Sequence, residues 1–285
     1  KVNFAMHRDL GIELVLVANN DELVFLNANT DPYTNGATGP MLGENPPVLN
    51  QVIGLNNYDI GHVVGTNAGG LASLGVVCRD NKAAGVSCQF GNYFDEEFYI
   101  IVAHEMGHQF TARHTFNNCE GNESSGTAFE PGSGNTIMSY SGAGCSLWNQ
   151  NVNDPYYHVN SIQSISNYAR ESFGYTCPEE IETENLTPDI VLPFQNGFYI
   201  PRNTPFELIG EAIDENGDDL TYTWEQYDLG PQIPTGQTPF GTAPFFKYNP
   251  PTNEPIRIFP RIDRILRNDY DNRLDFLPDT SREMN

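Results

Sequence analysis

The sequence predicts an α/β fold over residues 1–178, followed by a β-rich module over residues 189–285. Short apolar runs rich in β-branched residues indicate strands in the first part, where two further stretches show helical spacing. An acidic, proline-bounded linker at residues 179–188 ends this part, and alternating apolar residues with turn signals replace the helical spacing after it. A chain of 285 residues, 39% of them hydrophobic, is long enough for two such domains.

Four segments of the first part are predicted as strands because they are short, apolar and rich in β-branched residues. Residues 11–17 would form a buried strand, and residues 22–27 a second short strand or its hairpin continuation. The other two strands are expected at residues 71–77 and 84–87. Residues 29–47 lack this pattern, so we expect a loop there.

Two helices are predicted in the same part. Residues 94–110 carry three acidic side chains in their first turn, at positions 95–97, which suit the positive end of a helix dipole. Residues 161–173 repeat apolar side chains at helical spacing. Residues 50–55 are expected to be the end of a helix, and residues 117–155, rich in Gly, Ser and Asn, should be irregular.

The most informative motif is His104-Glu105-Met106-Gly107-His108, followed by His114. On a helix, histidines four residues apart lie about 40° and roughly 6 Å from each other, so both can bind one metal ion. On a continued helix His114 would lie about 15 Å beyond His104, so the chain must turn sharply after His108. Three imidazoles leave an open zinc position for water, beside the Glu105 carboxylate.

This spacing, with Ile137-Met138-Ser139-Tyr140 downstream, resembles the metzincin clan of zinc endopeptidases, which carry a later methionine turn beneath the metal. Further stretches resemble the reprolysin (adamalysin-like) family, in the form found in secreted bacterial proteins. These stretches are residues 58–62, 69–72, 75–78, 82–86 and 103–116. The family usually has glycine where this chain has Thr111, at the turn where a β-branched residue is unfavourable.

The resemblance implies a secreted, zinc-dependent endopeptidase that acts on proteins or peptides. Glu105 would be the general base, since a zinc-bound water has its pKa lowered towards about 7. Met138 would form the floor of the site. Tyr140 would bind zinc as a fifth ligand or stabilise the oxyanion, and a tyrosine packed under the helix is an equal alternative.

The resemblance also implies an edge strand above the cleft. An extended substrate would pair antiparallel with the backbone of Gly70, Leu71 and Ala72, a mode of binding that needs little side-chain information. An ordinary edge strand is the alternative. His62 lies just before this segment and is predicted to be a surface or packed residue, because it lacks ligand spacing.

Five cysteines suggest disulfides and an oxidising compartment. The resemblance pairs Cys78 with Cys177, and Cys119 with Cys145 would then close the loop between the third histidine and the segment after the methionine turn. Cys88 is left over. A Cys78–Cys88 bridge is the competing arrangement, because ten residues form an easily closed loop.

In the C-terminal part, residues 206–213 and 220–224 alternate in polarity around a tight acidic turn. This part resembles the immunoglobulin-like or cadherin-like modules of secreted bacterial proteins. Asp214, Asn216 and Asp218 could supply oxygen ligands to Ca²⁺, although a solvated acidic hairpin without a metal is slightly favoured.

Charge and hydropathy exclude some partners. The formal net charge of −23 argues against nucleic acid and anionic membrane surfaces. No apolar run reaches the roughly 18 residues of a membrane span. Both ends are expected to be shortened, since the resemblance implies a strand and a long helix before residues 8–17 and a β-rich module that continues past Asn285.

Two functions of different classes therefore remain. The first is the zinc endopeptidase, which rests on the presence of Glu105 together with all three histidines. The second is a non-catalytic module that binds a cell surface or matrix and uses the metzincin fold as a scaffold. Hydrolysis of a non-peptide amide is a weaker third hypothesis. A test for peptide cleavage, and for its loss when a chelator removes the metal, separates these functions.

Overall fold

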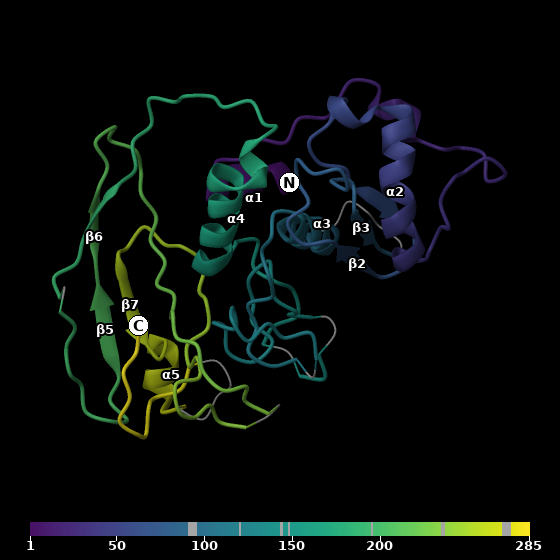
Figure 1. The fold of residues 1–285 in the computed structure, drawn as a ribbon. Helices are drawn as coiled ribbons and strands as arrows, with labels where there is room; N and C mark the ends of the chain where they lie inside the picture. Colours follow the sequence, from purple (N-terminus) through teal and green to yellow (C-terminus); the bar gives the residue numbers. More distant parts are fainter. Residues whose placement is uncertain are drawn as a thin grey trace. The chain divides into compact units, whose positions relative to one another are not determined.

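A computed structural model describes residues 1–90, 96–119, 121–142, 145–147, 149–194, 196–234, 237–269 and 275–285 (Figure 1). The chain divides into two compact units. The first unit comprises Lys1–Arg113 and Pro155–Glu179, and the second comprises His114–Asp154 and Glu180–Asn285. The division into domains at residues 1–178 and 189–285 with a linker at 179–188 stays a prediction.

The first unit contains four α-helices and a three-stranded mixed sheet among its described residues. The helices are α1 (Val2–Leu10), α2 (Thr38–Val52), α3 (Glu96–Gln109) and α4 (Val159–Glu171), and the strands are β1 (Val63–Gly65), β2 (Gly69–Ala72) and β3 (Gly85–Cys88). In the sheet β3 is central, parallel to β1 and antiparallel to β2. Strand β2 therefore lies at an edge of this sheet. Short 3-10 helices occur at Asn20–Leu23, Leu55–Asn57 and Phe173–Tyr175.

Strand β3 is buried on both faces, because α2 and α3 cover opposite sides of it. Val86 and Cys88 pack against Met41 of α2. Gly85 faces the other way, since a Cβ at this glycine would lie 2.3 Å from Oε1 of Gln109 in α3. This alternation follows the two-residue period of a strand and fixes α3 against the sheet.

Helix α2 contradicts the loop expected at residues 29–47, for it begins at Thr38 and contains two consecutive prolines in its interior. Each interior proline removes a backbone hydrogen bond and disfavours the helix by about 3 kcal/mol. Burial offsets this cost: Met41, Asn45 and Leu49 lie four residues apart on one buried face. The Asn45 amide also donates to the carbonyl of Ala83, 2.7 Å away. Tertiary packing thus overrides local propensity here.

The strands expected at residues 11–17 and 22–27 are wrong, because neither segment pairs with any described strand. A 3-10 helix at Asn20–Leu23 replaces part of the second. Val15 and Leu16 are 80% and 81% exposed, so the apolar run is not buried within this chain. A β-branched run becomes a strand only when a partner satisfies its backbone groups.

The strand expected at residues 71–77 ends at Ala72, and β1 was not predicted. Residues 73–77 instead form a turn that contacts α3 and α4. The hydroxyl of Tyr168 in α4 donates to the carbonyls of Gly75 and Val77, at 2.9 and 2.8 Å. This segment therefore leaves the sheet to hold two helices.

Helices α3 and α4 confirm the helices predicted at residues 94–110 and 161–173, and the strand predicted at residues 84–87 corresponds to β3. Residues 94 and 95 lie outside the described residues. Helix α2 ends at Val52, which agrees with the helix end expected at residues 50–55.

The second unit is mostly irregular in its first part. The described residues of 114–154 form no helix or strand, only an isolated bridge between Phe116 and Glu130, as the composition predicts. Farther along the chain, β4 (Asp189–Val191) pairs with β6 (Glu211–Ile213), and β5 (Phe206–Ile209) pairs with β7 (Ile256–Phe259), both antiparallel. A short helix, α5 (Ile262–Arg267), follows.

An immunoglobulin-like sandwich is not evident in the described residues of 189–285. They form two separate two-stranded sheets, and the strand expected at residues 220–224 contributes only a single bridge, between Tyr222 and Thr252. An aromatic cluster forms the core beside β5 and β7: Phe245, Phe246, Phe259 and Phe276.

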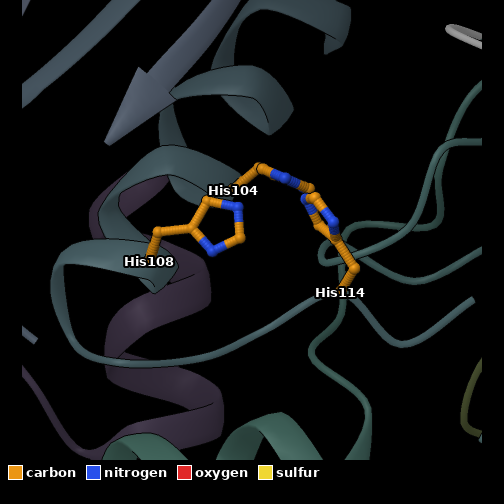
Figure 2. Close-up of side chains that lie close together, drawn as sticks. All are labelled: His104, His108 and His114. Atoms are coloured by element: carbon orange, nitrogen blue, oxygen red, sulfur yellow. The ribbon is translucent and has the colours of Figure 1, made fainter. Parts of the chain in front are cut away.

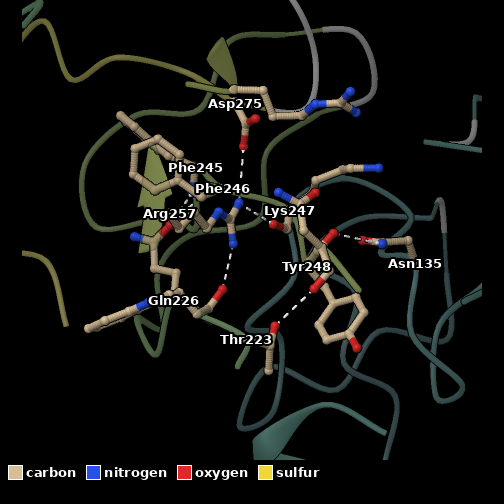
Figure 3. A network of polar contacts seen from close by, with 12 residues as sticks. Asn135, Thr223, Gln226, Phe245, Phe246, Lys247, Tyr248, Arg257 and Asp275 are labelled. Carbon is tan, nitrogen blue, oxygen red and sulfur yellow. Dashed lines mark hydrogen bonds and ion pairs between the residues drawn. The ribbon is translucent and has the colours of Figure 1, made fainter. Parts of the chain in front are cut away.

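A buried arginine organises the backbone around this aromatic core (Figure 3). The guanidinium of Arg257 donates to the carbonyl of Lys247 at 2.6 Å and lies 3.4 Å from the Asp275 carboxylate. It also lies over the ring of Phe259, 4.2 Å from its centroid. Removing either charge would leave the other charge buried without its partner, which is strongly destabilising. The pair therefore favours this arrangement of the backbone around the aromatic core.

The structure contains two disulfides, Cys78–Cys177 in the first unit and Cys119–Cys145 in the second. These are the pairs that the resemblance implies. The competing Cys78–Cys88 bridge is wrong, because Cys88 is a buried free thiol in the cluster with Met41.

Candidate metal centre

Helix α3 presents His104, Glu105 and His108 from its last two turns. His104 and Glu105 are buried, and the rings of His104 and His108 lie 4.7 Å apart at nearly right angles. The end of this helix is held from outside, since the backbone N–H of Gly75 donates to the carbonyl of His108 at 3.0 Å. A carbonyl at the helix end is thereby satisfied, which fixes the position of the histidine turn.

The chain turns directly after α3, as the ligand spacing requires. The N–H of Ala112 donates to the carbonyl of Gly107 at 2.9 Å, and the N–H of Thr111 donates to that of His108 at 2.7 Å. This pair of bonds is a Schellman motif, whose left-handed residue is usually glycine. Here Thr111 occupies it with φ of 84°. The turn therefore forms in spite of the β-branched side chain.

His114 is held by a backbone carbonyl and two aromatic rings. Its Nδ1 lies 2.6 Å from the carbonyl oxygen of Asn122. Its ring stacks on Phe116, with centroids 5.0 Å apart, and lies 4.8 Å from the ring of Tyr140. Burial lowers the pKa of His114, although the Asn122 carbonyl and the Glu123 charge oppose this.

The hydrogen bonds of two histidines assign their tautomers. Nδ1 of His108 lies 2.7 Å from the carbonyl oxygen of Ala112, as Nδ1 of His114 does from that of Asn122. A carbonyl oxygen only accepts, so in both rings Nδ1 carries the hydrogen and the lone pair is on Nε2. A carbonyl on the outer nitrogen is the usual support of a metal-binding imidazole.

The three histidines lie together (Figure 2). One ring nitrogen from each of His104, His108 and His114 can be chosen so that all lie within 4.8 Å of one another. Nitrogen ligands about 2.1 Å from a tetrahedral zinc ion are about 3.4 Å apart, so a small adjustment would close the set. In the described part of the chain, these three histidines form a group of metal-binding side chains close enough together to hold one metal ion.

Glu105 lies between the histidine pair in sequence and against the edge strand in space. Burial raises the pKa of its carboxyl group to about 8. A Cβ placed on Gly70 of β2 would lie 2.4 Å from Cγ of Glu105 and 2.5 Å from Oε1. Only a residue without a side chain allows this close approach, so the backbone of β2 passes directly beside the carboxylate. Leu71 and Ala72 continue the same edge strand.

Met138 and Tyr140 belong to the segment that follows the irregular loop. Met138 is fully buried, and its carbonyl accepts a hydrogen bond from the N–H of Thr115 at 3.2 Å. The ring of Tyr140 lies 4.7 Å from that of Phe116 as well as beside His114. The methionine turn thus contacts the third histidine and the two residues that follow it.

The acidic turn in the C-terminal part is held by a hydrogen bond within it and by two to the segment before β4. The N–H of Asp218 donates to Oδ1 of Asp214 at 3.1 Å. The Asn216 side chain accepts from the N–H of Leu186 at 2.7 Å and donates to the carbonyl of Glu184 at 3.0 Å. These contacts match the solvated hairpin, and calcium binding here stays a prediction.

Sequence reasoning missed a polar network behind the helix. Nδ1 of His62 lies 2.8 Å from Oε1 of Gln109, and Nε2 lies 2.8 Å from the hydroxyl of Ser87. The Gln109 amide also donates to the carbonyls of Gly61 and Lys82. His62 thus joins the last residue of α3 to β3. Its sequence neighbourhood drew attention to it, but the partner on α3 could be found only from the fold.

A helix with two histidines four residues apart, a sharp turn to a third and a buried glutamate beside the first is the arrangement of metzincin zinc metallopeptidases. Residues 1–115 match the family model described as metallo-peptidase family M12B, Reprolysin-like. The match supports a reprolysin-like metzincin domain in this part of the chain. A search of the curated proteins found no match.

The family match indicates the enzyme class. The chain is a zinc metalloendopeptidase, a hydrolase that acts on peptide bonds. Zinc is the metal that this family uses, and the donor set of three imidazoles suits it. None of the described helices is both long and apolar enough to cross a lipid bilayer.

Proposed function

We propose that this chain is a secreted zinc endopeptidase in which His104, His108 and His114 bind the catalytic ion and Glu105 is the general base. The observation that carries the proposal is the triad itself, since one ring nitrogen from each histidine lies within 4.8 Å of the others. Glu105, the residue after the first ligand, is buried. The tautomers of His108 and His114, which place the lone pair on Nε2, support it further.

The residues of the chain have separate tasks in this reaction. Bound zinc would supply a Lewis acid that polarises the scissile carbonyl and acidifies a water molecule. Glu105, one residue after the first ligand, takes the proton of the attacking water on a carboxylate oxygen and then delivers it to the leaving amine. Its burial and its contact with Gly70 hold the carboxylate in one place.

Strand β2 is the proposed substrate-binding edge. It pairs with β3 on one side, which leaves the backbone groups of Gly70, Leu71 and Ala72 at the sheet edge available for an extended peptide. Because Gly70 touches Glu105, a peptide that pairs with this strand runs directly past the general base. Backbone pairing alone would give broad specificity.

Met138 is proposed as the floor of the metal centre, and its complete burial supports this role. For Tyr140, packing on the ring of His114 supports a role in holding the third ligand. Its roles as a fifth zinc ligand or as an oxyanion stabiliser remain alternatives. Replacement of Tyr140 by Phe retains the packing and removes the hydroxyl, so a lowered kcat would favour the alternatives.

Secretion and the C-terminal module complete the proposal. Two disulfides support an oxidising, extracellular location, because paired thiols are rare in the cytosol. We retain residues 189–285 as an accessory β-rich module of immunoglobulin-like or cadherin-like type that could bind Ca²⁺ through Asp214, Asn216 and Asp218. A module that binds a surface or matrix without catalysis is the alternative for the whole chain.

Mass-spectrometric mapping of cuts in a mixed peptide library tests the proposal. The library is incubated with the unmodified chain, with its Glu105→Gln variant and with the chain plus a chelator, and bound zinc is counted in each sample. Cleavage by the unmodified chain only, with one zinc in both proteins, is the expected result. One bound zinc without any cleavage would refute catalysis and favour the binding module.

A further inference from the structure

We propose that Glu130 is a positioning residue of the metal centre, whose buried carboxylate connects the residue after His114 to the methionine turn. The inference rests on the proposed zinc site and adds a residue outside the ligand motif. Glu130 lies in the irregular segment between the third histidine and Met138, where no sequence pattern marks it.

The Glu130 carboxylate is buried and accepts five hydrogen bonds. Its Oε1 accepts from the backbone N–H groups of Asn135 and Thr136, at 2.9 and 3.0 Å. Its Oε2 accepts from the hydroxyls of Thr115, Thr136 and Ser139. Glu130 is only 1% exposed. A buried carboxylate costs several kcal/mol unless such donors compensate it, so these bonds favour a single local arrangement.

One end of this network fixes the third histidine. Thr115 follows His114 directly and is held at three points. The Thr115 hydroxyl donates to the Glu130 carboxylate. The Thr115 carbonyl accepts from the N–H of Glu130 at 2.8 Å, and the Thr115 N–H donates to the carbonyl of Met138. With Nδ1 of His114 on the Asn122 carbonyl, both the backbone and the ring of the ligand have defined positions.

The other end fixes the methionine turn. Thr136 and Ser139 lie on either side of Met138, and both donate their hydroxyls to the same carboxylate oxygen. The Ser139 hydroxyl also lies 2.9 Å from that of Thr115. A shift of the turn relative to His114 would therefore break several bonds at once. Metal sites require ligand positions good to about 0.5 Å, which a connection of this kind can provide.

The test measures zinc affinity rather than activity alone. Zinc is titrated in competition with a chromogenic chelator into the unmodified chain, Glu130→Gln and a control, Asp228→Asn. Asp228 is the control because its carboxylate is also buried and accepts hydrogen bonds from Gln226 and Asn285. It differs from Glu130 in that it also pairs with the Arg282 guanidinium, 3.4 Å away. We expect Glu130→Gln to weaken zinc binding about 10-fold to 100-fold, as loss of an outer support of a ligand does. The control should change it less than about twofold.

Substitution of Co²⁺ for zinc gives a second readout that general destabilisation does not change. The visible absorption bands of the bound Co²⁺ should shift in Glu130→Gln and stay in place in Asp228→Asn. Equal affinities and spectra in the unmodified chain and Glu130→Gln, or equal losses in both variants, would overturn the role of Glu130. Failure of the unmodified chain to bind one zinc would instead overturn the proposed function.

If Glu130→Gln does not fold, Thr115→Val decides the question. It removes one donor to the carboxylate, keeps the shape of the side chain and leaves the charge with four hydrogen bonds. Weaker zinc binding with an unchanged near-ultraviolet circular dichroism spectrum supports the connection. Unchanged zinc affinity in this variant refutes it.

Discussion

His62 should make the stability of the fold sensitive to acid, and His62→Asn should remove this sensitivity. The Gln109 amide nitrogen donates to the carbonyls of Gly61 and Lys82, so Oε1 of Gln109 must accept from Nδ1–H of His62. Nε2 then accepts from the hydroxyl of Ser87. The neutral ring of His62 satisfies the hydrogen bonds of both partners. A second proton, on Nε2, would point at the Ser87 hydroxyl hydrogen unless that hydroxyl turned.

Burial lowers the pKa of His62 from its ordinary value of 6.5 to about 4. The folded protein therefore resists protonation that the unfolded chain accepts below pH 6.5. The stabilisation by the neutral ring is complete above pH 6.5 and is lost as the pH falls towards 4, where both states become protonated. At about 1.4 kcal/mol for each pH unit, this loss amounts to about 3 kcal/mol.

Urea denaturation between pH 4 and pH 7, with chelator present so that zinc release does not contribute, measures this effect. The free energy of unfolding of the unmodified chain, minus that of His62→Asn, should fall by about 3 kcal/mol as the pH is lowered from 7 to 4. His7→Asn, a substitution of an exposed histidine, is the control. Parallel curves for the unmodified chain and His62→Asn would refute the assignment of the network.

Two further predictions concern the turn and the edge strand. Thr111→Gly should raise the free energy of unfolding by about 1 kcal/mol in thermal denaturation, because Thr111 has φ of 84° and glycine adopts such a backbone without steric cost. A lower stability of this variant would show that the Thr111 side chain stabilises the fold by more than its left-handed backbone costs. Gly70→Ala should lower kcat at least about 10-fold while zinc affinity stays within about twofold, because the new Cβ would displace Glu105, the proposed general base. Gly43→Ala in α2, where a Cβ meets nothing within 4 Å, is the control, and equal rates in both variants would contradict the contact.

The local features of the chain could be predicted because short-range geometry determines them. The period of an α-helix places His104 and His108 on one face, and the ten-residue distance to His114 requires the turn that Thr111 makes. Helical spacing likewise predicted α4, and composition predicted the irregular segment after His114. Each of these inferences involves residues that are neighbours in sequence.

Only the tertiary structure decided which segments find partners. Residues 11–17 have strand-forming side chains but pair with no strand in the described part of the chain. Helix α2 contains two interior prolines but buries Met41 against β3 and Leu49 against Tyr58 and Ala83. Burial and pairing outweigh local propensity because they involve several kcal/mol per element, whereas propensities differ by less than about 1 kcal/mol for most residues.

The same distinction applies to the metal centre. The sequence by itself determined the three histidines, the glutamate and the turn, since their spacing is a property of one helix and its end. The contacts that support them were decided by the fold: Gly70 lies against Glu105, His62 is hydrogen-bonded to Gln109 of α3, and Glu130 is hydrogen-bonded to Thr115, which follows His114. Each joins segments distant in sequence through a contact that exists only after packing, and no pattern in the chain encodes such a contact.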